Sequence, residues 1–171
     1  MVKEELIIEL GKKGELNDLS PGDYRIIRLD RRSELIPIAS LWFSEKWGVP
    51  SEEYIKSMNT SVTELQSIPK WYVVISNDNT IIAGAGVIKN DFHDRPDLSP
   101  NVCALFVEKS YRQQDIAKCL LDFIQKDLKE LGIEKLYLIT DHINFYEKLG
   151  WRFKTYVKEN DGNETRLYET L

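Results

Sequence analysis

Residues 101–140 contain the pattern that most narrowly limits the fold: an apolar strand, a long amphipathic helix and a second strand. The first strand is expected over residues 101–107. The helix is expected over residues 112–131, where apolar residues recur at spacings of one, three and four. Gly132 follows as a C-terminal cap, and residues 135–140 form the second strand. Two strands joined through a helix lie parallel in one sheet, with a right-handed crossover.

The rest of the chain adds hairpins and further helices to this unit. Helices are expected over residues 32–47 and 51–67, with a short one from Asp141 or Asn144 to Leu149. The remaining strands are expected at residues 24–29, 71–76, 81–89, 152–158 and 165–170.

This order of elements predicts one α/β (α+β) domain over residues 21–171, with residues 1–20 as an N-terminal extension. The sheet is expected to be mixed and twisted, with about seven strands and helices on both faces.

Composition limits the class of protein. The 171 residues carry 23 Lys and Arg against 28 Asp and Glu, and this net charge of −5 argues against nucleic acid or anionic membrane as a partner. No segment has the length and flanks of a signal peptide, and none approaches the ~20 apolar residues of a membrane span. Cys103 and Cys119 lack metal-like spacing, so we expect two buried free thiols, no metal and a cytoplasmic protein.

The segment LFVEKSYRQQDIA, at residues 105–117, is where a strand ends and the long helix begins. The first backbone N–H groups of a helix have no partner within the helix, and the helix dipole places positive charge there. Such a junction can bind an anion, pyrophosphate included, although most strand–helix junctions bind nothing.

The residues of this junction resemble the GNAT superfamily of N-acetyltransferases. Residues 112–117 read RQQDIA, similar to the pyrophosphate loop of that family, and the preceding LFV is similar to its aliphatic–aromatic–Val strand. Downstream, residues 144–151 read NFYEKLGW and resemble the second family signature. The resemblance covers residues 24–171. It implies a GNAT-like fold, acetyl-CoA as co-substrate, and transfer of an acetyl group to a primary amine of a small-molecule acceptor.

The resemblance also assigns roles to residues. Tyr146 would be the general acid that protonates the leaving sulfur, since a phenol with a pKa near 10 keeps its proton beside a thiol near 8.5. Backbone groups of Leu105 and Val107 would hold the pantetheine arm, and the N–H of Phe106 or Val107 would face the thioester oxygen. Arg112 and the N–H groups from Gln113 to Lys118 would bind the pyrophosphate. The full set implied for acetyl-CoA is Leu105, Phe106, Val107, Arg112, Gln113, Gln114, Asp115, Ile116, Ala117, Lys118 and Asn144.

Asp115 stands where the family has the first glycine of the loop. A carboxylate about 4 Å from a phosphate costs up to about 4 kcal/mol at an effective dielectric near 20, before screening. Alternatively, the side chain turns away from the ligand and caps the helix, because Asp is favoured in a first turn.

The acceptor site implied by the resemblance includes Trp47, Tyr54 and His93, with aromatic rings suited to an amine or its cation. Trp42 and Trp47 are five residues apart and do not share one helical face, and we expect Trp42 in the core. Each histidine is more often a surface or hydrogen-bonded residue than a catalytic base. The base itself stays open; the candidates are Glu108, Asp91, His93, Asp94, His142 and water.

Two other functions fit the same motifs. Asp115 is compatible with a CoA-binding or ligand-sensing module that has lost turnover. The acceptor could instead be a protein N-terminus or a lysine, for which an open groove rather than a closed aromatic pocket is expected. A homodimer through the last strands is a further expectation from family analogy.

Overall fold

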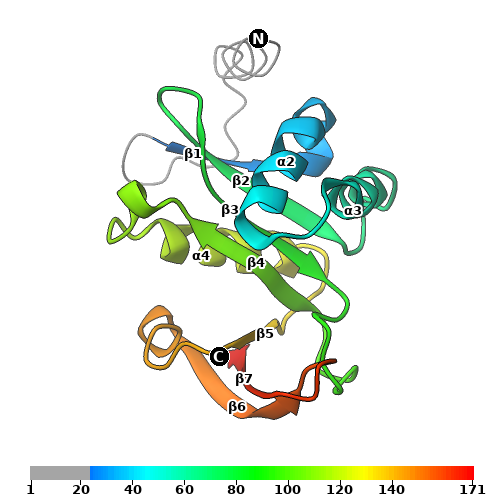
Figure 1. Cartoon of the computed structure of the whole chain (residues 1–171), viewed down its shortest axis with the longest axis vertical. Coiled ribbons are helices and arrows are strands. Elements are labelled where there is room, and N and C mark those ends of the chain that lie inside the picture. Colours follow the sequence, from blue (N-terminus) through cyan, green and yellow to red (C-terminus); the bar gives the residue numbers. More distant parts are fainter. Residues whose placement is uncertain (1–23) are drawn as a thin grey trace.

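In the part of the chain that the structure describes, seven strands form one sheet in the order β1-β2-β3-β4-β5-β7-β6 (Figure 1). The structure is a computed structural model and describes residues 24–171, so the expected extension at residues 1–20 lies outside the described residues. β4 and β5 are parallel and the other neighbours are antiparallel, which confirms the predicted mixed sheet. The strands are β1 (Tyr24–Arg28), β2 (Lys70–Ser76), β3 (Ile81–Ile88), β4 (Asn101–Val107), β5 (Tyr137–Thr140), β6 (Trp151–Lys158) and β7 (Glu164–Thr170).

Helices cover both faces of the sheet, as predicted. α2 (Ile36–Trp47) and α3 (Ser51–Thr63) pack on one face, and α4 (Ile116–Lys129) packs on the other (Figure 1). Across residues 24–171, none of the helices combines the length and apolarity that crossing a bilayer demands.

Three predicted helices begin later than expected. Residues 29–35 form two 3₁₀ turns before α2, and Pro37 then lies in the first turn of α2, where a missing N–H costs nothing. α4 starts at Ile116 rather than at residue 112, because the four residues before it form a loop. The short helix expected to end at Leu149 is a single 3₁₀ turn, Glu147–Leu149, closed by Gly150 with φ of 88°.

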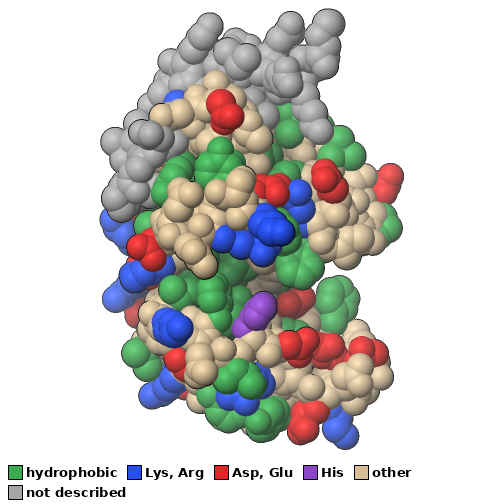
Figure 2. Space-filling model, turned by 60° about the vertical axis from the view of Figure 1, so that its left-hand side comes forward, with side chains coloured by type: hydrophobic (Ala, Val, Ile, Leu, Met, Phe, Trp, Pro, Cys, Tyr) green, Lys and Arg blue, Asp and Glu red, His purple; other side chains and the backbone are tan. Residues whose placement is uncertain are grey.

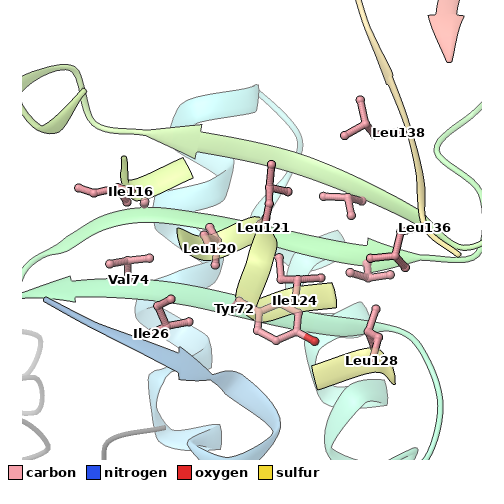
Figure 3. Close-up of a cluster of buried hydrophobic side chains, with 14 of the residues drawn as sticks. Ile26, Tyr72, Val74, Ile116, Leu120, Leu121, Ile124, Leu128, Leu136 and Leu138 are labelled. Atoms are coloured by element: carbon pink, nitrogen blue, oxygen red, sulfur yellow. The ribbon is translucent and has the colours of Figure 1, made fainter. Parts of the chain in front are cut away.

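The apolar stripe of α4 makes the larger core. Leu120, Leu121, Ile124 and Leu128 are each at most 1% exposed and pack over Tyr72 and its neighbours on the sheet (Figure 3). Each such side chain contributes roughly 1.5–3 kcal/mol on burial. Cys119 on the same helix is only half-buried, so the prediction of two buried thiols holds for Cys103 alone.

The opposite face carries an aromatic core. Phe43 of α2 packs edge to face against Trp71 of β2, with ring centroids 5.1 Å apart. Two glycines of β3 leave the room for these rings, since a Cβ at Gly84 would lie 2.7 Å from Phe43 and one at Gly86 would lie 2.5 Å from Trp71. Part of this aromatic core also lines the candidate active site.

Candidate active site

β4 and β5 pair at one point, Asn101 with Tyr137, and then diverge (Figure 1). A bulge in β4 strengthens the divergence: Ala104 has φ of 54°, and the register with β3 shifts between Gly84 and Gly86. We call the gap the β4–β5 opening. Along it, the second half of β4 has no strand partner on its β5 side among residues 24–171.

The register decides which backbone groups face the β4–β5 opening. The N–H of Glu108 donates to the carbonyl of Ile82 on β3, at 2.7 Å. Because N–H groups alternate in direction along a strand, the N–H of Phe106 also points to β3, whereas those of Leu105 and Val107 point into the opening. Of the two donors proposed for the thioester oxygen, Phe106 is therefore wrongly oriented and Val107 is not.

A cavity of about 800 Å³ passes through the β4–β5 opening. Its lining includes Leu105 and Tyr146, which belong to the core on the α4 side, and Tyr54 and Cys103, which belong to the core on the α2–α3 side. The cavity is therefore reached by side chains from both faces of the sheet. Figure 2 shows a hollow at mid-height on the surface of the molecule, with acidic side chains and a histidine at its margin.

Aromatic rings form one wall of the cavity. Tyr54 stacks on Phe43 and meets Trp71 edge to face, with both centroid distances at 5.5 Å. Trp47 is 48% exposed and donates from Nε1 to the carbonyl of Ala104 at 3.2 Å, which holds its ring over the bulge. Trp42 is buried in the core, as predicted, so the structure separates the two tryptophans by role.

Carboxylates form another wall. We call Glu53, Asp91, Asp141, Glu159 and Asp161 the acidic wall. Burial raises the pKa of Asp91 to about 6; Glu159 adds to the rise and His93 opposes it. The pKa of Glu159 is raised by burial and then by Asp161 and Asp141. Among the described residues, no group of three or more His, Cys, Asp or Glu is arranged to hold a metal ion.

Most of the acidic wall was not identified from the sequence, where only Asp91 was a candidate. Asp141 follows β5 directly, while Glu159 and Asp161 follow β6. The sequence does show that these acids come just after strand ends. It does not show the strand order β5-β7-β6, which brings them together in the fold.

Tyr146 lines the cavity and lies just before the 3₁₀ turn Glu147–Leu149. Its side chain is 7% exposed, and burial raises its pKa to about 12. Its hydroxyl has no hydrogen-bond partner within residues 24–171 and belongs to the cavity lining. Asn144 is exposed, has φ of 71° and does not line the cavity.

The loop before α4 has the free amides expected of an anion site. Gln113 and Asp115 are both in the left-handed region, with φ of 64° and 60°. The backbone N–H groups of residues 113–118 find no acceptor among the described residues; Cys119 is the first to donate, to the carbonyl of Asp115. Arg112 donates from Nε to the carbonyl of Val107 at 3.0 Å, which ties the loop to β4.

Asp115 occupies the N-cap position of α4, but its side chain makes no capping bond to any of the described residues. The capping alternative is therefore not seen, and the carboxylate is exposed next to the free amides. The left-handed backbone that glycine would provide is nevertheless present, since Asp tolerates this conformation better than most residues.

Two residues considered for the site have structural partners instead. His93 is buried and outside the cavity lining: Nδ1 accepts from the N–H of Arg95 at 3.2 Å, so Nε2 carries the proton and donates to Oδ1 of Asn101 at 2.6 Å. This corrects the assignment of His93 to the acceptor site. Glu108 accepts from Trp42 Nε1 at 2.9 Å and from Lys46 Nζ at 2.6 Å, outside the cavity.

Comparison with known proteins agrees with this geometry. Residues 69–153 match the family model of the acetyltransferase (GNAT) domain. A GNAT-family acetyltransferase from Staphylococcus aureus Mu50 has a similar structure, with TM-score 0.57, 23% identity, and coverage of 86% of this chain and 98% of that one. A comparison with curated proteins finds no match.

Two further similar structures carry the names of amine acetyltransferases. One is an aminoglycoside 6′-N-acetyltransferase complexed with coenzyme A, with TM-score 0.59, 19% identity, and coverage of 85% of this chain and 95% of that one. The other is a chimeric spermidine N-acetyltransferase built from Vibrio cholerae SpeG and hSSAT, with TM-score 0.63, 14% identity, and coverage of 88% and 96%. At these identities the likeness shows the fold alone.

Proposed function

Because this chain carries a GNAT acetyltransferase domain, we propose that it transfers the acetyl group of acetyl-CoA to a primary amine of a small-molecule acceptor. The observation that carries the proposal is the cavity through the β4–β5 opening. Leu105 on the open edge of β4 lines this cavity together with the aromatic rings and the acidic wall. The loop with the free amides follows directly from the end of β4.

The residues present fit acetyl-CoA. Backbone groups of Leu105 and Val107 would pair with the pantetheine arm along the open edge of β4. The free amides of residues 113–118 and the start of α4 would bind the pyrophosphate, as helix N-termini do for anions. Acetyl-CoA supplies the acetyl group as a thioester, and coenzyme A is bound in one of the similar structures.

The chemistry follows from the lining residues. The amine, once neutral, attacks the thioester carbonyl, and the N–H of Leu105 or Val107 would stabilise the oxygen as it becomes negative. The C–N bond forms, the C–S bond breaks, and Tyr146 gives its proton to the departing sulfur and recovers one from solvent. With a pKa raised to about 12, Tyr146 keeps this proton at neutral pH.

Asp91 is the base that fits this geometry best. It lines the cavity, and its pKa of about 6 makes it a stronger base than an ordinary aspartate while leaving it ionised at neutral pH. It would accept the proton that the amine loses as the C–N bond forms. Glu108 and His93 are both committed to other partners.

The test is binding of acetyl-CoA by calorimetry, followed by thiol release with a panel of amines. We expect saturable binding and amine-dependent thiol release. A protein with no affinity for acetyl-CoA or CoA, even at low ionic strength, would overturn the proposal.

One observation favours a second candidate, a CoA-binding sensor without turnover: the Asp115 carboxylate is exposed beside the free amides. Tight binding of acetyl-CoA with no thiol release for any amine would favour this reading.

A further inference from the structure

The acidic wall differs from most of the other partly buried acids of the protein. Elsewhere, Asp30 pairs with Lys70, and Glu169 pairs with Arg152. In the cavity, the carboxylates of Glu53, Asp91, Asp141 and Glu159 have no ion-pair or hydrogen-bond partner among the described residues. No lysine or arginine of residues 24–171 lines the cavity. Burial and neighbouring carboxylates raise the pKa of Asp91 and of Glu159, which means that their ionised forms are disfavoured. No lysine or arginine of the described lining offsets that cost.

A second observation at the same cavity indicates a polar ligand. Tyr54 and Tyr146 are each 7% exposed, both line the cavity, and neither hydroxyl has a hydrogen-bond partner within the described residues. Both hydroxyls keep some contact with the cavity space, where a ligand or water can bond to them, since the fully buried unpaired side-chain atoms of residues 24–171 are Asn79 Oδ1 and Trp151 Nε1. Tyr54 is close enough to Asp91 for that carboxylate to help raise its pKa to about 12, after burial and Cys103. A phenol donor and a carboxylate acceptor therefore face the same space.

Resting on the proposed function, we infer that the acceptor carries at least one cationic group in addition to the amine that is acetylated. The acceptor class is thus a diamine, a polyamine or an amino sugar with several amines. The spare ammonium group would lie against Asp141, Glu159 and Asp161, with the reacting amine near Tyr146 and Leu105.

A monoamine would gain little from this wall. Carboxylates stabilise the ammonium form and so make the neutral nucleophile harder to form. The reacting amine also loses its charge as the amide forms, so its attraction to the wall is lost during the reaction. A second ammonium stays charged throughout, and its attraction holds the acceptor in both ground state and transition state.

The experiment compares linear diamines with amino alcohols of the same chain length, which differ in one charge. We expect kcat/KM for the preferred diamine to exceed that of its amino alcohol about tenfold or more, and the ratio to fall at high salt. Glu159→Gln with Asp161→Asn should reduce the ratio severalfold. Glu164→Gln, on β7 across the same turn and outside the cavity lining, is the matched control and should leave it unchanged.

Binding separates this inference from the proposed function. Titration of the protein, saturated with CoA, with the diamine and the amino alcohol reports acceptor recognition without turnover. Preferential binding of the diamine, lost in the double variant, supports the inference even for a protein that does not turn over. Equal kcat/KM or equal affinity for the two acceptors overturns the inference and leaves acetyl transfer intact.

Discussion

Nε2 of His93 donates to Oδ1 of Asn101 across 2.6 Å, and this bond joins the loop after β3 to the start of β4. The same oxygen accepts from the N–H of Asp91 at 2.8 Å, so the histidine and the proposed base share one anchor. His93 thus supports the acceptor side of the cavity from behind rather than lining it.

We therefore expect His93→Ala to act mainly on stability. Removing a buried hydrogen-bonding side chain should cost about 1–3 kcal/mol, or about 2–4 °C in Tm per kcal/mol, as measured by calorimetry. His142→Ala is the control, because His142 is exposed at the cavity margin and should leave Tm nearly unchanged. An unchanged Tm for His93→Ala would contradict the structural role.

Tyr146→Phe should lower kcat about 10²- to 10⁴-fold, the usual contribution of a general acid. The KM for acetyl-CoA should change little. Stability should change little too, since the hydroxyl has no protein partner to lose within the described residues. Single-turnover thiol release measures the step. Tyr54→Phe is the matched control; it should raise the KM for the amine more than it lowers kcat. Full activity of Tyr146→Phe would remove Tyr146 from the mechanism.

Asp91→Asn should separate stability from activity. The folded-state pKa of Asp91 is about 6, above the ordinary 3.8, so the charged form is destabilised by folding. The cost is absent below about pH 4 and complete above about pH 6, where it amounts to about 1–3 kcal/mol. Asp91→Asn should therefore raise Tm at pH 8 but not at pH 4.

The same variant should lower kcat/KM for the amine at pH 8, and wild-type kcat/KM should fall as pH drops through about 6. Thermal unfolding at the two pH values and a pH–rate profile measure both effects. A variant that is less stable than wild type at pH 8 would show that Asp91 has a favourable partner in the folded state.

Asp115→Gly should tighten binding of CoA about three- to thirtyfold at low salt, because it removes a negative charge beside the proposed pyrophosphate-binding site. Asp115→Asn isolates the charge, since Asn also tolerates the left-handed backbone. Both gains should shrink at 1 M salt, where screening acts within about 3 Å. Calorimetric titration with CoA checks the result; weaker binding by Asp115→Asn would mean that the carboxylate contacts the ligand favourably.

The sequence predicted the elements well because periodicity and glycines report local preferences, as at the stripe of α4 and at Gly150. It misplaced the start of α4 because Gln113 and Asp115 adopt a left-handed backbone without being glycine. The bulge at Ala104 has no sequence signal, since it depends on pairing with β3. Asp141, Glu159 and Asp161 of the acidic wall were missed for the same reason: they are neighbours only after β7 pairs between β5 and β6.

Because the cavity is open to both faces of the sheet, it affects the order in which the two reactants can bind. If the nucleotide arrives along the α4 side and the acceptor along the α2–α3 side, neither reactant blocks the entry of its partner. Both could then be bound together, and we expect direct acetyl transfer, with initial-rate plots that intersect rather than run parallel. Cys103 is the one thiol of the described residues that lines the cavity. Burial raises its pKa well above the ordinary value, so it stays a thiol rather than the thiolate that would act as a nucleophile. Cys103 is therefore unsuited to carry the acetyl group in a two-step reaction through an acetyl-enzyme.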